Sequence, residues 1–234
     1  MLKIEHLTKT YGSKKAVDDL TLHIEPGQIY GFIGHNGAGK TTTLKACAGI
    51  MQYDSGEITI DGKSLKKDPL GCKSVMAYLP DNPDLYEFLS GIKYLNFIAD
   101  VYGVPSDVRN ERIKRYADMF SLTADLAQPV SAYSHGMKQK LTLISALIHE
   151  PKLLLMDEPF VGLDPKASFT TKELMRELCA RGGAIFFSTH VLEVAEKLCD
   201  RVAIIKNGRL VVSGTMEMVR GDSSLESVFL ELEG

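Results

Sequence analysis

A glycine-rich octapeptide between an apolar strand and a helix constrains this chain more than any other feature. The segment Gln28–Ile33 has the composition of a buried strand. The residues that follow it, Gly34–Thr41, read GHNGAGKT and precede a helix-forming segment that continues to about Ala48. This is the GxxxxGK[ST] pattern in the strand–loop–helix setting that it requires. The chain is therefore expected to contain a loop that wraps around phosphate groups.

The chemistry of this loop favours a triphosphate with magnesium. Glycines let backbone N–H groups converge on phosphates, and the N-terminus of the helix adds partial positive charge. Lys40 is expected to reach the β- and γ-phosphates, and the Thr41 hydroxyl to ligate Mg²⁺. A glycine-rich turn is the alternative, but chance matches arise on the order of once in a hundred chains this long. The predicted phosphate-loop residues are Gly34, His35, Asn36, Gly37, Ala38, Gly39, Lys40, Thr41 and Thr42.

Composition excludes several other classes of protein. The 234 residues include 27 basic and 30 acidic side chains, which gives a net charge of −3. Proteins that hold nucleic-acid backbones usually carry a basic excess, so no nucleic-acid partner is expected. The most apolar runs, such as Leu153–Met156 and Ala184–Phe187, are of strand length, whereas a membrane-spanning helix needs roughly 17–25 residues. We expect a cytoplasmic protein that has no membrane span of its own.

The order of strand-length and helix-length segments predicts an α/β fold with a mostly parallel sheet. The segments Leu2–Leu7, Leu20–Ile24 and Glu57–Ile60 instead alternate apolar with polar residues, which is typical of an antiparallel sheet. Asn207–Gly208 predicts a two-residue hairpin near the end of the chain. The expected fold is a phosphate-loop NTPase core with a mostly parallel sheet and an N-terminal antiparallel β subdomain.

An inserted helical subdomain is expected between the two halves of this core. From Pro80 to about Glu150 no strand pattern is found, and amphipathic segments lie near Ile92–Tyr102, Val108–Phe120 and His135–His149. We interpret residues 1–234 as one domain. It consists of a core (1–80 and 151–215), a helical subdomain (81–150) and a C-terminal tail (216–234).

Two acidic residues, Asp157 and Glu158, follow the apolar strand Leu153–Met156. A buried parallel strand tolerates acids only at its C-terminal tip, where open α/β sheets form their ligand crevices. Asp157 is placed to hold Mg²⁺, directly or through water, and Glu158 to polarise an attacking water. A helix N-cap or a turn pair is the alternative reading. The phosphate loop in the same chain favours the metal and water chemistry.

Three further motifs complete a family pattern. Tyr133–Gln139 reads YSHGMKQ and opens an apolar helix, Gly162–Pro165 reads GLDP, and Ser188–His190 reads STH. With the two sites above, these motifs resemble the nucleotide-binding subunit of an ABC transporter, in that family's order and over nearly the whole chain. Tyr133–Met137 is similar to the family's LSGGQ signature. The resemblance implies ATP and Mg²⁺ as ligands.

The resemblance also implies roles for single residues. Ser134 and Gly136 would bind the γ-phosphate held by a second chain, so that two chains enclose two ATP molecules head to tail. Tyr11 would stack on adenine, with an ordinary turn tyrosine as the alternative. His190 would contact the γ-phosphate and hold the catalytic geometry. Asp164 lies in the loop through which the two subunits sense each other, and it also reads as a helix N-cap before Pro165.

The chain departs from the family pattern at several positions. His135 and Met137 replace the first glycine and the glutamine of the signature. Asp81 stands where the family usually has a glutamine that links Mg²⁺ and the attacking water to the membrane subunit. Aspartate is shorter and charged, so it is expected to reach the metal through water. The predicted metal ligands are thus Thr41, Asp157 and Asp81, and the predicted catalytic residues are Glu158, His190 and Lys40.

The leading functional hypothesis is an ATP-hydrolysing subunit that powers a separate integral-membrane permease. It would lie on the inner face of the cell membrane as a homodimer, or paired with a homologous ATPase subunit. The stretch Asp81–Ser90 and the signature most resemble bacterial subunits of exporter-type permeases. The alternatives are a soluble ABC ATPase acting on a nucleic-acid or protein assembly, and a module that binds ATP without turnover. A single set of motifs and the retained Lys40 and Glu158 argue against them.

Overall fold

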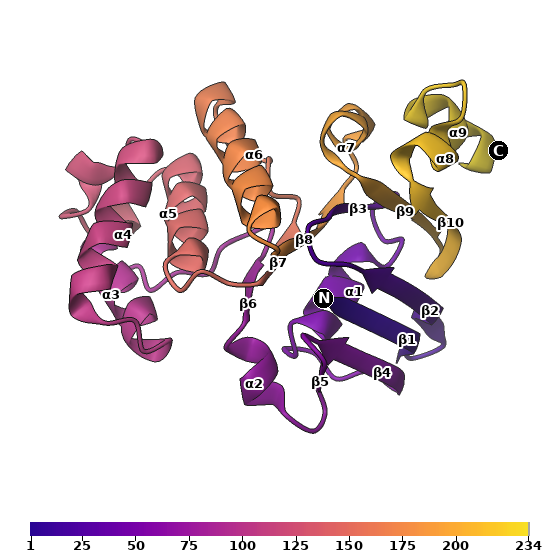
Figure 1. Ribbon diagram of the computed structural model, residues 1–234, viewed down its shortest axis with the longest axis horizontal. Coiled ribbons are helices and arrows are strands. Elements are labelled where there is room, and N and C mark those ends of the chain that lie inside the picture. Colours follow the sequence, from indigo (N-terminus) through magenta and orange to yellow (C-terminus); the bar gives the residue numbers. More distant parts are fainter. Residues whose placement is uncertain (234) are drawn as a thin grey trace.

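The N-terminal part of the chain forms a four-stranded antiparallel sheet (Figure 1). The structure is a computed structural model that describes residues 1–233. In β1 the apolar residues Leu2, Ile4 and Leu7 are fully buried while most residues between them are exposed, as an amphipathic strand requires. This confirms the predicted antiparallel sheet. Its strands, in the order β2-β1-β4-β5, are β1 (Leu2–Tyr11), β2 (Lys14–Ile24), β4 (Ser55–Ile60) and β5 (Lys63–Ser64).

A second, six-stranded sheet forms the centre of the molecule in the order β10-β9-β3-β8-β7-β6. The five strands from β9 to β6 run parallel, and β10 pairs antiparallel with β9 through the predicted Asn207–Gly208 hairpin. Every residue of β3, β7 and β8 is buried, which explains their continuous apolar runs. The strands are β3 (Ile29–Ile33), β6 (Met76–Leu79), β7 (Leu153–Asp157), β8 (Ala184–Thr189), β9 (Arg201–Lys206) and β10 (Arg209–Thr215).

Alternation along the central strands divides the apolar interior into two cores. Phe187 and Met156 face one core, which also receives the helices of the 81–150 region. Phe186 and Leu155 face the other, which lies against the antiparallel sheet and includes Leu44 of helix α1 (Lys40–Cys47). Helix α1 therefore packs between the two sheets, and this position fixes the loop that precedes it.

The helical region lies at one end of the molecule, and the C-terminal helices lie at the other (Figure 1). The predicted helices near 92–102, 108–120 and 135–149 are present as α3, α4 and α5. A short helix, α2, was not predicted. The helices are α2 (Pro69–Lys73), α3 (Gly91–Val101), α4 (Ser106–Met119), α5 (His135–Leu147), α6 (Pro165–Ala180), α7 (Leu192–Leu198), α8 (Met216–Arg220) and α9 (Leu225–Glu233), with 3₁₀ turns at Thr123–Asp125 and Val130–Ala132.

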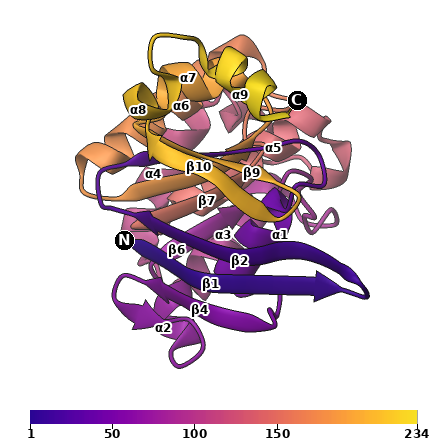
Figure 2. The same cartoon turned by 90° about the vertical axis from the view of Figure 1, so that its right-hand side faces the viewer.

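The tail is helical as predicted, and its last residue, Gly234, lies outside the described residues. Figure 2 shows α8 and α9 above the β9–β10 hairpin, with β1 and β2 below it. Among residues 1–233, no helix has the length and apolar character needed to cross a bilayer.

His149, just after α5, is held neutral inside the fold. Its ring stacks on Tyr102 with centroids 3.6 Å apart and planes 10° from parallel. Its Nε2 lies 3.2 Å from the Met76 carbonyl oxygen. Burial lowers the pKa of His149 to about 4, and the positive charge of Arg112 adds to the lowering.

We predict that His149 makes the protein acid-sensitive. Well above pH 6.5 the ring is neutral in both the folded and the unfolded chain, and its packing contributes fully to the free energy of unfolding. Between about pH 6.5 and 4 the unfolded chain binds a proton that the folded chain does not, so stability falls as the pH falls. The full effect is about 3 kcal/mol. Urea denaturation at pH 7, 6, 5 and 4 should give a shallower pH dependence for His149→Gln; equal slopes in the two proteins would contradict this.

Candidate functional site

The phosphate loop crosses the seam between the two sheets. It begins where β3 ends, and it finishes at Gly39, the N-cap of α1, whose φ is 113°. A Cβ on Gly34 would lie 2.5 Å from the Ile205 carbonyl oxygen at the end of β9, and one on Gly39 would lie 2.3 Å from the Ala16 carbonyl oxygen in β2. Both glycines are therefore required by backbone contacts, one with each sheet.

Lys40 is curled into the loop that it closes. The side chain is 6% exposed, and Nζ donates to the carbonyl oxygens of Gly34 at 2.6 Å and His35 at 3.2 Å. Burial lowers the pKa of Lys40, and the nearby carboxylates of Glu158 and Asp157 oppose that shift. A cation held by loop carbonyls beside a helix N-terminus can exchange these contacts for contacts with an anion.

A pocket of about 320 Å³ opens beside the loop and collects most of the residues predicted from sequence. All but two of its lining residues were expected there; the two that were not are Lys14 and Ala16. It is lined by Tyr11, Lys14, Ala16, Asn36, Gly37, Gly39, Lys40, Thr41, Thr42, Asp81, Asp157 and Glu158. Residues from both sheets thus meet in one pocket.

The acidic pair at the end of β7 is fixed by β8. Asp157 is 2% exposed, and its Oδ1 accepts a short hydrogen bond from the Ser188 hydroxyl. The backbone N–H of Glu158 donates to the same hydroxyl oxygen at 3.1 Å and to the Ser188 carbonyl oxygen at 3.2 Å. Ser188 therefore orients both acids. The sequence analysis named it as part of the Ser188–His190 motif but gave a role only to the histidine.

Glu158 also joins the other predicted catalytic residues. Its Oε1 lies 2.9 Å from His190 Nδ1 and 3.8 Å from Lys40 Nζ. The Glu158 side chain is 12% exposed, whereas that of His190 is 52% exposed, so the histidine covers the acid from the solvent side. Glu158 thus lies between two residues from separate parts of the sequence, Lys40 and His190.

Asp81 is an acid whose pKa is raised by its place in the pocket. Burial raises its pKa, and the negative charges of Asp157 and Glu158 raise it further; His135 and His190 oppose these effects. Asp81, Asp157 and Thr41 bring side-chain oxygen atoms to this pocket, and oxygen is the ligand type that Mg²⁺ prefers. Among residues 1–233, no three acidic, histidine or cysteine side chains lie close enough together to form a metal cluster by themselves. The residues present therefore fit a magnesium ion that takes one or two protein ligands and completes its shell with phosphate oxygens and water.

Tyr11 also lines the pocket. Its ring is half exposed, Lys9 Nζ lies 5.1 Å from the ring centroid, and its hydroxyl donates to Met51 Sδ at 2.9 Å. The ring is thus held in place by contacts within the antiparallel sheet region while part of it stays accessible to a planar ligand.

Several predicted residues lie outside this pocket. His35 and Ala38 line an adjacent pocket of about 280 Å³. Ser134 caps α5, with the Met137 N–H 3.3 Å from its Oγ. Asp164 caps α6 through the Ala167 N–H at 2.8 Å. Ser134, Gly136 and Asp164 are not among the lining residues, so the structure does not bring the signature to the phosphate loop of the same chain.

The signature and the Asp164 loop do contact each other. A Cβ on Gly162 would lie 2.5 Å from the His135 ring, and one on Gly136 would lie 2.9 Å from the Gly162 carbonyl oxygen. Lys140 Nζ lies 2.6 Å from Asp164 Oδ2, and this hydrogen bond is the main reason that the pKa of Asp164 is lowered. The two elements therefore form one packed surface.

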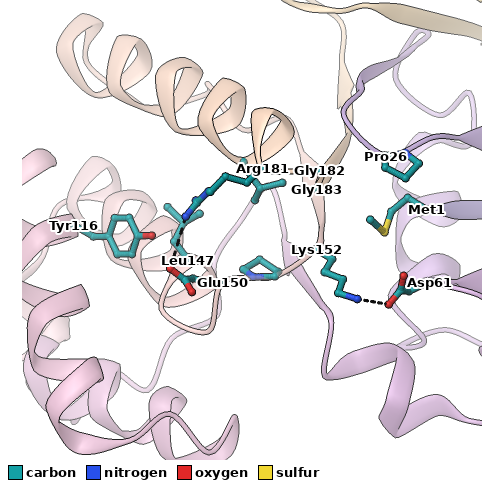
Figure 3. A pocket seen from close by; sticks show the side chains of 12 residues that line it. Met1, Pro26, Asp61, Tyr116, Leu147, Glu150, Lys152, Arg181, Gly182 and Gly183 are labelled. Atoms are coloured by element: carbon teal, nitrogen blue, oxygen red, sulfur yellow. Dashed lines mark hydrogen bonds and ion pairs between the residues drawn. The ribbon is translucent and has the colours of Figure 1, made fainter.

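A larger pocket, about 430 Å³, lies away from all of these residues (Figure 3). It is lined by the segments that precede β3, β7 and β8, and so it marks the opposite edge of the parallel sheet. A Lys152–Asp61 ion pair of 2.7 Å and Tyr116 lie along it. None of the sequence-predicted site residues lines it.

The sequence model of the ABC transporter family matches residues 17–161. The chain belongs to this family. It is 35% identical to the ABC-type transporter ATP-binding protein EcsA of Bacillus subtilis, over 99% of this chain and 96% of that protein. It is 33% identical to the linearmycin resistance ATP-binding protein LnrL of Bacillus subtilis, over 92% and 69% respectively. A solved structure of the ATP-binding subunit of an ABC transporter superposes with a TM-score of 0.96 at 35% identity and covers all of both chains. The protein is an ABC ATPase that binds ATP.

Residues that the motifs did not reveal also shape this ABC ATPase site. Lys14 projects from the antiparallel sheet and lines both pockets beside the phosphate loop. Its only sequence signal is its place three residues after Tyr11. Lys140 lies in α5, one helical turn after the signature. Its pairing with Asp164 could not be predicted from the sequence, because it depends on α5 and the start of α6 being neighbours in the fold.

We predict that two loop glycines respond differently to substitution. Gly37 has a φ of 81° and no atom within 4 Å of an added Cβ, so Gly37→Ala should cost about 1–2 kcal/mol through backbone strain alone. Gly39→Ala adds the collision with the Ala16 carbonyl and should cost about 3 kcal/mol or more. Urea denaturation without nucleotide measures both, and equal losses would contradict the close contact.

Proposed function

We propose that the pocket beside the phosphate loop binds Mg-ATP and hydrolyses it, and that this reaction powers a membrane permease. The observation that carries the proposal is the convergence of Lys40, Asp157 and Glu158 on one pocket, with His190 against Glu158. Lys40 supports the phosphates, Thr41 and Asp157 hold the metal, and Tyr11 packs on the adenine. When bound, the magnesium ion would neutralise phosphate charge.

The chain's own residues supply the remaining chemistry. Glu158 accepts a hydrogen bond from the attacking water and increases its nucleophilicity. His190, whose Nδ1 is 2.9 Å from Glu158, keeps that carboxylate in place and reaches toward the γ-phosphate with its other nitrogen. Asp81 contributes through water to the metal. Its pKa is raised first by burial and then by the negative charges of Asp157 and Glu158, and a divalent cation would offset the repulsion among these charges.

A second ATPase subunit completes the site in this proposal. Ser134 and Gly136 begin a 13-residue helix, yet neither lines the phosphate pocket of its own chain. Helix N-termini favour anions, and the free end of this helix suits the γ-phosphate of a partner chain. We infer a head-to-tail dimer, either of identical chains or with a related subunit, in which Asp164 lies at the contact between subunits.

The permease would dock on the helical subdomain at residues 81–150. Exposed aromatic side chains gather there: Tyr86, Phe88 and Phe97 are 51%, 81% and 41% exposed, and the Tyr86 ring contacts both of the others. Such a patch is typical of a protein-interaction surface. We infer peripheral attachment to the inner face of the cell membrane. The resistance role in the name of LnrL favours export as the direction of transport.

We predict that Glu158→Gln lowers ATP turnover by about 100-fold or more while nucleotide binding and ATP-dependent dimerisation remain. The amide keeps the size of the side chain but cannot act as a base. Phosphate release, nucleotide titration and size-exclusion chromatography with ATP measure the three properties. Glu217→Gln, an exposed acid on α8, is the matched control. Unchanged turnover in Glu158→Gln would reject this residue as the base.

We also predict that the protein co-purifies with a multi-spanning membrane protein when isolated from membranes in mild detergent. Replacing Phe88 and Phe97 with serine should weaken that association, because it removes exposed apolar area; the basal ATPase activity should persist. Mass spectrometry of the co-purified material identifies the partner. Ribosomal proteins or DNA in place of a membrane protein would overturn the transport proposal.

A further inference from the structure

The C-terminal helix α9 contacts the phosphate loop. The Phe229 ring packs against the imidazole of His35, with centroids 4.9 Å apart and planes inclined by 61°. This is an edge-to-face arrangement, which aromatic pairs prefer. His35 is the second residue of the loop, and its carbonyl oxygen accepts a hydrogen bond from Lys40. A residue at the end of the chain thus touches the element that binds phosphate.

Helix α9 is anchored well enough to hold this contact. Its inner stripe, with helical spacing, consists of Leu225, Val228, Phe229 and Leu232. Leu225 is fully buried, and Phe229 is 7% exposed. At the start of the helix, the Leu225 N–H donates to Glu196 Oε2 of α7 at 3.0 Å. The helix therefore packs as part of the core and is not a loose tail.

The far end of α9 is tied to the same strand that supports the loop. Lys206 Nζ donates to the Leu232 carbonyl oxygen at 3.0 Å. The neighbouring residue, Ile205, is the one whose carbonyl oxygen approaches Gly34. His35, Ile205 and Lys206 line one pocket beside the loop. The end of β9 thus contacts the loop on one side and α9 on the other.

We propose that Phe229 is a positioning residue for the phosphate loop, and that α9 acts as a clamp on the nucleotide site. This inference rests on the proposed binding of nucleotide at that loop. Phe229 restrains the His35 side chain, and through it the backbone N–H groups that must converge on the phosphates. Phe229 touches neither Glu158 nor His190, so the clamp acts on nucleotide affinity and leaves the chemical step unchanged.

Linkage makes the effect reciprocal. If docked α9 favours nucleotide binding, then bound nucleotide must favour docked α9 by the same factor. The amides of α9 should therefore exchange with solvent deuterium more slowly when nucleotide is present. Phe229→Ala should remove this slowing, because it breaks the connection while the Glu196 and Lys206 anchors remain.

The affinity experiment uses the full-length chain and titrates Mg-ADP by calorimetry. Phe229→Ala should weaken binding about twofold to tenfold, the factor expected from one edge-to-face aromatic contact, with kcat for ATP unchanged at saturation. Leu230→Ala is the matched control, since Leu230 lies on the same helix and is 63% exposed. Phe229→Leu, which keeps apolar volume in the core, serves if the alanine variant does not fold, and it too should bind more weakly.

A double-mutant cycle tests whether Phe229 acts through His35. Phe229→Ala should cause little further loss of ADP affinity in a His35→Ala background. Additive losses of affinity would overturn the clamp. So would unchanged affinity in both Phe229 variants, or hydrogen–deuterium exchange of the α9 amides that nucleotide does not slow.

Lys40→Ala separates this inference from the proposed function. If Lys40→Ala binds ADP as tightly as the unmodified protein, nucleotide binding at the loop is contradicted. If Lys40→Ala binds ADP more weakly but the Phe229 variants bind it with unchanged affinity, only the proposed role of α9 is overturned.

Discussion

The nucleotide site depends on backbone contacts that fix the phosphate loop between two sheets. Gly34 approaches the carbonyl of Ile205 in the parallel sheet, and Gly39 approaches the carbonyl of Ala16 in the antiparallel sheet. Neither contact leaves room for a Cβ, so the loop geometry is set only when both sheets are docked. Helix α1 lies between them and contributes Leu44 to the shared core. Folding of the N-terminal sheet is therefore a condition for shaping the site, although most of the chemistry-bearing residues come from the parallel sheet.

Charge in the site is balanced only in part by the protein itself. Lys40 is buried close to the carboxylates of Asp157 and Glu158, and Asp81 adds a third acid. Burial raises the pKa of Asp81, and the neighbouring negative charges raise it further, while burial lowers the pKa of Lys40. Fixed donors and acids in a pocket where Lys40 and Glu158 are largely buried favour ligands that bring both positive and negative charge. A metal–triphosphate complex offers this combination.

The sequence predicted those features of the fold that depend on residues close together in the chain. Alternation of apolar residues located the antiparallel strands, and helical periodicity located α3, α4 and α5. The cap at Asp164 could be predicted because a cap involves neighbours in sequence. The phosphate-loop pocket could be predicted because its glycines and Lys40 are contiguous. The Phe229–His35 contact and the lining by Lys14 could not be predicted, since each joins segments that meet only through the packing of the whole fold.

The acidic pair shows why sequence order alone does not give side-chain direction. In a regular strand, Asp157 and Glu158 would point to opposite faces of the sheet, yet both line the same pocket. The backbone supplies the reason: Glu158 has a φ of 48°, in the left-handed region that non-glycine residues rarely adopt. Its N–H is held by two acceptors on Ser188, paired with Asp157 across the β7–β8 ladder. The ladder thus sustains a strained turn that brings both carboxylates to one side, and Ser188 is as much a part of the site as the acids that it orients.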